Sequence, residues 1–455
     1  MHIKRLEIEN LRSIEDASLD LNVPGVGSLE YTNVNVLLGG NGLGKTSVLR
    51  AAALSVLGPL LSSSSGFVSE GMVRRPPESR GFSSTVSPQL KPANVTAYID
   101  CSIENSSDLS IGRVVNDLVM RTDIRSLGTA ERLDWKVKPS SAAKLLETIL
   151  FNDEDAGFFI VGYGASRRVE SSVRVDESAR VKSRLRRYER VAGLFEDHLG
   201  LMPLSYWLPE YMLKNKGRYT QVFNLINDLL PEACRLQKTP VLTTNGREHL
   251  FEMNGVALPF RALSDGYRAY IGWIGDMLFH VCMGIGKGLK LREIQGVVLV
   301  DEIDLHLHPE WQRVVVPILA KALPYVQFIV TTHSPLVVGS LEAANLFVLT
   351  EENGATVIKR LPERVRGKSA EQILLSPYFG LESTRALGTA TQLNTLARKA
   401  ASGDKNASLK YLEILANGTL SNNVESYSVP EASTKKRSTN KVSSRKDAIK
   451  HQAPK

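Results

Sequence analysis

Cysteine is scarce in this chain of 455 residues, and the few cysteines present match no familiar spacing. Cys101, Cys234 and Cys282 are the only three, and they lie far apart in the sequence. A secreted fold held by disulfides uses a dense, even set of cysteines, and a zinc site uses pairs at short spacing. The composition therefore argues against both classes and predicts a protein of the reducing cytoplasm.

A long uncharged hydrophobic run is also missing. Met1 to Arg5 leads directly into alternating strand-like sequence, without the apolar segment of a signal peptide. The most hydrophobic helical stretch, residues 270–286, contains Asp276 and His280 and is too short to cross a bilayer. We expect no membrane partner.

The body of the chain has little net charge. The formal charge is +8, but residues 426–455 contribute +6 of it, with eight Lys or Arg side chains against two acids. This tail is rich in Ser, Thr and Lys and poor in apolar residues, which predicts disorder. The rest of the chain is left with +2, so any DNA site there must be a local patch.

A glycine-rich loop lies between a predicted strand (34–38) and a predicted apolar helix (47–57). It fits the phosphate-loop pattern G-x-x-x-x-G-K-[ST] in full, and strand-loop-helix is the context that the pattern needs. Its backbone N–H groups and Lys45 would contact phosphate oxygens, and the Thr46 hydroxyl would bind Mg²⁺. The predicted nucleotide-binding residues of this P-loop are Gly39, Gly40, Asn41, Gly42, Leu43, Gly44, Lys45, Thr46 and Ser47.

Two adjacent acids end a buried strand later in the chain. Residues 296–300 are an apolar run of the kind found in central parallel strands, and Asp301 and Glu302 follow it. Ligands bind at the carboxyl edge of such sheets. We predict that Asp301 holds Mg²⁺, and that Glu302 orients or deprotonates the attacking water.

A Leu-Ser-x-Gly segment precedes that strand and opens a long predicted helix, 265–282. Ser264 is suited to cap the helix, whose N-terminal end favours anions such as a γ-phosphate. The segment alone is weak evidence, since capped helices of this kind are common, but its place before Asp301 favours a nucleotide contact. The residues predicted to bind nucleotide here are Leu263, Ser264, Asp265 and Gly266.

His333 follows the next apolar run, 325–330, so it should lie at the same sheet edge as the acidic pair. We predict that it contacts the γ-phosphate and assists catalysis together with Lys45 and Glu302. Asp304, His306 and His308 could suggest a metal cluster, but no further ligand stands at metal spacing. A turn before a helix that starts at Pro309 explains them better.

Taken in order, these motifs resemble the ABC-class ATPases of the RecF, structural-maintenance-of-chromosomes and Rad50 group. Residues 3–13 are similar to that group's opening strand, and residues 301–309 to the acidic motif of its smaller members. These include the overcoming-lysogenisation-defect ATPases and the Septu-type ATPases of phage defence. The resemblance implies an α/β fold: an ABC-type P-loop head with a mixed sheet, flanking helices and an antiparallel β subdomain.

The resemblance also implies a mechanism and partners. ATP and Mg²⁺ would be the cofactors, and a homodimer or a higher oligomer would close on ATP. In each site Lys45 and Thr46 of one copy would face Ser264 and Gly266 of the other. Septu-type relatives work with a separate nuclease subunit, so a nuclease partner is expected here.

Three departures from the group's pattern are visible. No glutamine occurs between Gln89 and Gln221, so the glutamine that usually senses nucleotide is missing, and residues 163–168 stand in its place. Tyr267 stands where transporters usually carry a further Gly or Gln. The insertion before Leu263 is too short for long coiled-coil arms, and residues 336–424 contain no Asp-x-Asp of a Toprim nuclease.

The expected domain order follows from these positions. Residues 1–165 form a first ATPase lobe, 166–255 a helical insertion and 256–350 a second lobe. Residues 351–424 form a C-terminal helical extension, and 425–455 a disordered basic tail.

Three functions remain open: an ATP-hydrolysing regulator of a nuclease in antiviral defence, a RecF-like DNA-repair ATPase that binds DNA itself, and a membrane transporter's nucleotide-binding subunit. The missing glutamine and the His-Leu-His-Pro segment argue against the transporter. A basic stretch at 164–190 could grip DNA phosphates, although a solvated basic helix explains it equally well. Its basic residues are Arg167, Arg168, Arg174, Arg180, Lys182, Arg184, Arg186, Arg187 and Arg190.

Overall fold

The structure is a computed structural model. It describes residues 1–63, 70–75, 90–103, 113–127, 130–152, 158–169, 186–196, 200–243, 246–285 and 290–417. The chain divides into two units, residues 1–384 and residues 385–455. Among the described residues, no helix has both the length and the apolar character needed to span a membrane.

One large mixed sheet organises the first unit. In the described part of the chain it has 11 strands in the order β6-β5-β4-β1-β2-β18-β17-β3-β16-β15-β7. The strands are β1 (His2–Leu11), β2 (Ile14–Asp20), β3 (Val34–Gly39), β4 (Ala93–Ile103), β5 (Arg113–Leu127), β6 (Ala130–Lys138), β7 (Ile160–Tyr163), β15 (Gly296–Val300), β16 (Val326–Thr331), β17 (Leu346–Glu352) and β18 (Ala355–Lys359). The α/β fold with a mixed sheet and flanking helices is confirmed.

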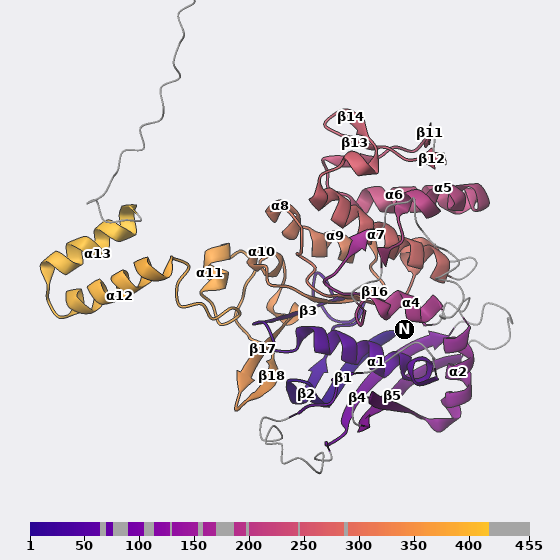
Figure 1. The fold of residues 1–455 in the computed structure, drawn as a ribbon, viewed down its shortest axis with the longest axis horizontal. Coiled ribbons are helices and arrows are strands. Elements are labelled where there is room, and N and C mark those ends of the chain that lie inside the picture. Colours follow the sequence, from indigo (N-terminus) through magenta and orange to yellow (C-terminus); the bar gives the residue numbers. More distant parts are fainter. Residues whose placement is uncertain are drawn as a thin grey trace, which may run out of the picture. The chain divides into compact units, whose positions relative to one another are not determined.

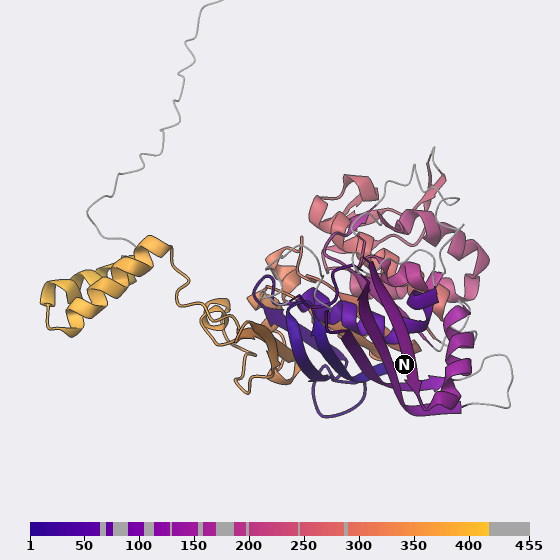
Figure 2. The ribbon, with the colours of Figure 1, turned by 60° about the horizontal axis from the view of Figure 1, so that its bottom comes forward.

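The two halves of this sheet differ in strand direction. β17, β3, β16, β15 and β7 run parallel to one another, whereas β2, β1, β4, β5 and β6 are antiparallel neighbours. Figure 2 shows the long antiparallel strands side by side in indigo and purple. Parallel strands need crossover connections, which place helices on their faces, and the apolar runs of β3, β15 and β16 are buried accordingly.

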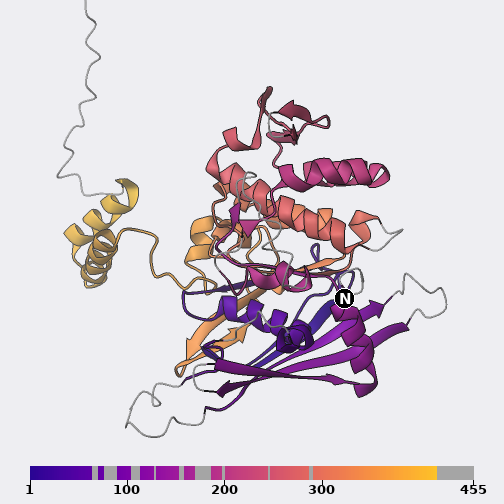
Figure 3. The same cartoon turned by 45° about the vertical axis from the view of Figure 1, so that its right-hand side comes forward.

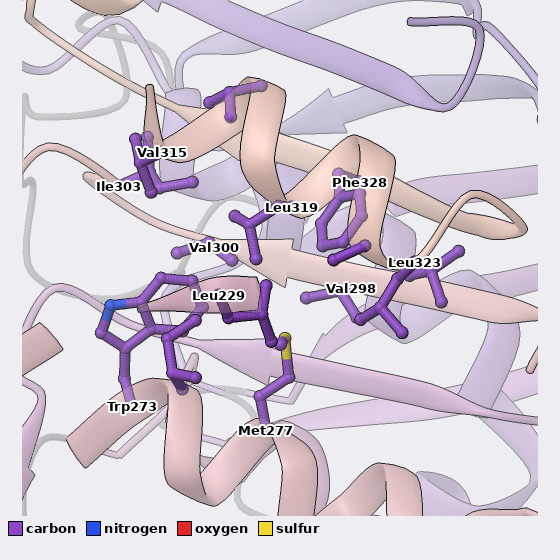
Figure 4. Packing of buried hydrophobic residues seen from close by; sticks show 14 of the residues in the cluster. Leu229, Trp273, Met277, Val298, Val300, Ile303, Val315, Leu319, Leu323 and Phe328 are labelled. Carbon is purple, nitrogen blue, oxygen red and sulfur yellow. The ribbon is translucent and has the colours of Figure 1, made fainter. Parts of the chain in front are cut away.

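Alternate side chains of β15 reach two separate cores. Val297 and Leu299 pack in the core that contains α1 (Lys45–Ser63), whereas Val298 and Val300 pack on the opposite face. That second core includes side chains from α6 (Lys216–Leu229), α7 (Asp265–Gly284) and α9 (Val315–Ala322). Figures 1 and 3 show α6 and α7 across the sheet from α1, and Figure 4 shows the packing.

Helix α1 is enclosed rather than amphipathic. Residues 51–61 are all buried, because the parallel strands contact one side of the helix and the antiparallel strands β4 to β6 contact the other. At Gly58 an added Cβ would lie 2.2 Å from the Thr122 hydroxyl of β5, so only glycine fits there. A helix that is apolar all round is expected to be buried in this way.

The segment expected to be a helical insertion, 166–255, is mixed instead. Its described helices are α4 (Arg186–Ala192), α5 (Leu204–Lys214) and α6, and residues 170–185 lie outside the described part. In the described residues, short strands between positions 168 and 258 form three small sheets. These strands are β8 (Arg168–Val169), β9 (Gly200–Leu201), β10 (Cys234–Leu236), β11 (Val241–Thr243), β12 (Gly246–Glu248), β13 (Phe251–Met253) and β14 (Val256–Leu258).

The C-terminal region is not purely helical either. β18 falls within the expected helical extension but pairs with β17 in the main sheet, because Gly354 takes a positive φ in the tight turn between them. In the first unit, helix α10 (Pro335–Val338) precedes these two strands and helix α11 (Ala370–Leu374) follows them. In the second unit α12 (Leu387–Ala401) and α13 (Lys405–Asn417) pack on each other, and the predicted disordered tail lies outside the described residues.

Candidate nucleotide-binding site

Four loops from four neighbouring parallel strands meet at one edge of the sheet. The strands β3, β16, β15 and β7 are adjacent and parallel, so their carboxyl ends point the same way. The P-loop follows β3, His333 follows β16, the acidic pair follows β15, and residues 164–167 follow β7. This edge is where open α/β sheets bind ligands.

The P-loop has the backbone conformation that its glycines permit. Gly42 and Gly44 adopt φ of 82° and 89°, and a Cβ on Gly44 would lie 2.6 Å from the Ser13 hydroxyl. Lys45 turns back over the loop and donates from Nζ to the carbonyl oxygens of Gly39 (2.9 Å) and Gly40 (3.1 Å). The pKa of Lys45 is lowered by burial, an effect that nearby carboxylates oppose.

Asp301, which follows β15, connects the P-loop to strand β16. The Thr46 hydroxyl donates to its Oδ2 at 2.7 Å, and the Thr331 hydroxyl donates to its Oδ1 at 2.6 Å. The carboxylate is buried at 6% exposure, so these two bonds replace the water it has lost. A hydroxyl and a carboxylate side by side are hard oxygen ligands, and this pair fits Mg²⁺, which prefers such donors.

Glu302 has a constrained backbone and an available side chain. Its φ is +48°, an uncommon conformation for a residue other than glycine. The backbone N–H donates to the Thr331 hydroxyl at 2.7 Å, and the backbone carbonyl accepts from Arg167 Nη2. Among the hydrogen bonds of the described residues, none involves the Glu302 carboxylate, which leaves it available to bind a water molecule.

Asp304 connects the turn that follows β15 (residues 301–306, the acidic turn) to Thr332 and His333 after β16. Its Oδ1 accepts from the Thr332 hydroxyl, and the His333 N–H lies 3.4 Å away. The His333 side chain is exposed at the sheet edge. The described residues contain no cluster of three metal-binding side chains, and His308 instead accepts from Glu310 N–H at the start of α8 (Pro309–Gln312).

Ser264 begins α7 but does not use its side chain as a cap. Its hydroxyl makes no capping hydrogen bond, and the residue is exposed. An added Cβ on Gly266 would lie 3.1 Å from the His306 carbonyl oxygen, so the helix start lies against the acidic turn. No hydrogen bond among the described residues joins Ser264 to the P-loop. Tyr267, the unusual third residue of the helix, packs against Trp311 with ring centroids 4.2 Å apart.

Two side chains of the site were missed by reasoning from the sequence. Thr331 bonds to both Asp301 and Glu302. The only feature of the sequence that pointed to it was its position at the end of an apolar strand, immediately before Thr332 and His333. Arg167 lies in the segment noted for its missing glutamine, and it reaches the carbonyl of Glu302.

The predicted basic patch is wrong for two of its residues. Arg187 is 1% exposed, and its Nη1 and Nη2 donate to the carbonyl oxygens of Phe158 and Asn152, the latter at 2.8 Å. Arg190 is 3% exposed. Neither guanidinium is available to a DNA backbone, because the helix that carries them packs against β7. Residues 170–185, which hold much of the remaining charge, lie outside the described residues.

Two families match different parts of this site. The family described as "AAA domain" matches residues 5–190, which include Lys45 and Thr46. The family described as "AAA domain, putative AbiEii toxin, Type IV TA system" matches residues 214–339, which include Ser264, the acidic pair and His333.

Curated relatives with similar sequences come from bacteria. "Septu protein PtuA" of Bacillus mycoides (strain KBAB4) is 25% identical over 84% of this chain and 45% of its own length. "Retron Ec83 probable ATPase" of Escherichia coli is 32% identical over 41% of this chain and 33% of its own length. The chain thus spans less than half the length of these relatives.

Solved structures with a similar arrangement are structural-maintenance-of-chromosomes heads. "Crystal structure of the SmcHead bound to the C-winged helix domain of ScpA" has a TM-score of 0.44 at 17% identity, covering 79% of this chain and 98% of that one. "SMC head domain from Thermotoga maritima" has a TM-score of 0.42 at 13% identity, covering 80% of this chain and 100% of that one.

Proposed function

We propose that this chain, an ABC-class ATPase related to the Septu and retron ATPases, binds and hydrolyses ATP between two copies and thereby regulates a partner nuclease in antiviral defence. The observation that carries the ATPase part is the contact of Thr46 with Asp301. It places the P-loop hydroxyl and the acidic-strand carboxylate at one point, as a shared Mg²⁺ site requires.

Each residue of the edge has a role in this proposal. Lys45 leaves the carbonyls of Gly39 and Gly40 and binds the phosphates, which offer a stronger, charged acceptor. Thr46 and Asp301 would hold Mg²⁺, which would supply positive charge to neutralise the phosphates. Glu302 orients the attacking water and accepts its proton.

The dimeric part of the proposal rests on Ser264. Its hydroxyl makes no bond within its own helix, and it is exposed at a helix N-terminus, where an anion is favoured. A serine in that position can donate to the γ-phosphate bound by a second copy. Closure on ATP and opening after hydrolysis would then give a conformational switch.

The defence role rests on the relatives. Septu and retron proteins are among the relatives that match, and this chain covers less than half of the two described above. The partner nuclease is inferred from the Septu resemblance. Direct DNA binding by this chain is less favoured, since the buried Arg187 and Arg190 remove two cations from the proposed patch.

Lys45→Ala tests the ATPase proposal. Losing a charged hydrogen-bond donor costs roughly 1.5–3 kcal/mol, so ATP affinity should fall about 10- to 100-fold. Equilibrium binding of a fluorescent ATP analogue and phosphate release would both be measured. Lys359→Ala serves as the control, because Lys359 lies on β18 in a surface pair with Glu352. Equal ATP affinity and turnover in the Lys45→Ala, Lys359→Ala and unaltered proteins would contradict the proposal.

A further inference from the structure

Arg167 is the one cation among the described residues that joins the acidic turn to helix α7. Its Nη2 donates to the backbone carbonyl of Glu302, and its guanidinium carbon lies 5.7 Å from the ring centroid of Trp273 on α7. Its Nη1 is shielded from solvent and has no hydrogen-bond partner. An unpaired buried donor of this kind is unfavourable, and an incoming oxygen anion would satisfy it.

The surroundings of Arg167 keep it charged. Burial lowers its pKa to about 10, while Asp301, Asp304 and Glu302 favour the protonated form. Since this pKa lies well above neutrality, Arg167 is a cation under ordinary conditions. A charged donor with a free N–H beside the acidic pair is suited to respond when a phosphate group enters the site.

The contact with α7 is extended by the strand that precedes Arg167. The Tyr163 hydroxyl donates to Asp276 of α7 at 2.8 Å, and the ring centroids of Tyr163 and Trp273 are 6.0 Å apart. Asp276 also accepts from Met202 N–H at 2.7 Å, so this part of the helix is held firmly. Figure 4 shows Trp273 pointing from α7 toward the strand that carries Val298 and Val300.

Helix α7 begins at the exposed Ser264, and β15 leads from Val300 directly into the acidic pair. Arg167 therefore touches the element that carries the catalytic acid and the element that carries the serine. Because the guanidinium is planar with fixed donors, a shift at either contact changes the other.

We propose that Arg167 is the nucleotide-sensing positioning residue of this ATPase: its free Nη1 binds an oxygen of the bound nucleotide, and its contacts with Glu302 and Trp273 couple site occupancy to α7. The inference rests on the proposed function, since it assumes that ATP enters this edge. It assigns to Arg167 the sensing role that a glutamine fills in many relatives.

The test compares Arg167→Met and Arg167→Lys with the unaltered protein. The methionine removes the charge and the donors on both terminal nitrogens, so kcat should fall at least about tenfold, and loss of the nucleotide contact should also raise KM. Lysine keeps the charge but lacks the planar set of guanidinium donors. The kcat of Arg167→Lys should therefore lie between those of Arg167→Met and the unaltered protein. Thermal melting of each variant would show whether the fold is retained.

A second measurement separates sensing from simple charge neutralisation. The ATP-dependent change in Trp273 fluorescence is obtained as the difference between each protein and its Trp273→Phe counterpart. We expect this change in the unaltered protein and its loss in Arg167→Met and Arg167→Lys, because neither replacement keeps the planar contact with both Glu302 and Trp273.

Arg360→Met is the matched control. Arg360 likewise donates to a backbone carbonyl, that of Asp20 at 2.7 Å, and lies 4.4 Å from the Phe347 ring centroid, but it does not face the acidic pair. Its variant should keep normal kcat and the normal fluorescence change. Unaltered kcat and fluorescence response in both Arg167 variants would overturn the inference. Failure of the unaltered protein to bind or hydrolyse ATP would instead overturn the proposed function.

Discussion

Glu302→Gln is expected to bind ATP, to lose nearly all hydrolysis and to accumulate as a closed dimer. The substitution keeps the shape of the side chain and removes its ability to accept a proton, so turnover should fall roughly 10²- to 10⁴-fold. Binding should persist, because the P-loop and the Thr46–Asp301 contact are untouched. Phosphate release gives the rate, and light scattering with and without Mg·ATP gives the mass.

A matched acid shows whether the effect belongs to the site. Glu351 is exposed on the β17–β18 hairpin, so Glu351→Gln removes the same charge without touching the acidic turn. It should hydrolyse ATP normally and should not accumulate as a dimer. Near-normal hydrolysis by Glu302→Gln would refute the role given to this acid, and a monomer with ATP bound would refute ATP-driven closure.

Ser264→Arg is expected to abolish hydrolysis while leaving the first step of ATP binding nearly intact. Ser264 is exposed and uncapped within its own chain, so the substitution should not unfold α7. In a shared site the larger side chain would clash with the nucleotide held by the second copy and block closure. Equilibrium ATP binding and light scattering would separate the two effects.

A serine that does cap its helix serves as the control for Ser264. Ser369 begins α11, where its hydroxyl accepts from Gln372 N–H at 3.2 Å. Ser369→Arg should cost roughly 1 kcal/mol of stability through the lost cap but leave ATP turnover normal. If Ser264→Arg turned over ATP as fast as the unaltered protein, the shared site would have to be abandoned.

The parallel half of the sheet could be predicted from the sequence because its strands are apolar on both faces. β15 reads as an uninterrupted hydrophobic run, β3 and β16 are hydrophobic apart from Asn35 and Gln327 within them, and each strand leads into a recognisable turn. The strand, glycine and helix around Lys45 are encoded within some thirty consecutive residues. Local sequence therefore specifies these elements without knowledge of their neighbours.

The β5–β6 hairpin could not be predicted in the same way. Its outer face is charged: Asp123 pairs with both Arg121 and Lys136, and Arg132 pairs with Asp134. Of these ion pairs, only Lys136–Asp123 joins the two strands, and it forms only after they are in register, so the sequence by itself reads as a polar segment. The strand assignment depends on the cross-strand contacts that folding creates.

The contacts of Arg167 and Arg187 were hidden for a related reason. Both are basic residues in a basic stretch, and the simplest interpretation of such a stretch is a solvated surface. Arg187 instead donates to two carbonyls in the interior, and Arg167 contacts Glu302, 135 residues later in the chain. Arg167 and Glu302 come together because β7, which precedes Arg167, pairs with β15, which precedes Glu302.

Mixing Lys45→Ala with Ser264→Arg tests the joint site most directly. Each variant alone should be inactive, but a mixed dimer contains one site with the intact lysine of one copy and the intact serine of the other. With random pairing, about half of the dimers are mixed, each with one working site, so about a quarter of the normal phosphate release should return. A mixture as inactive as its two components would contradict the claim that two copies share each nucleotide.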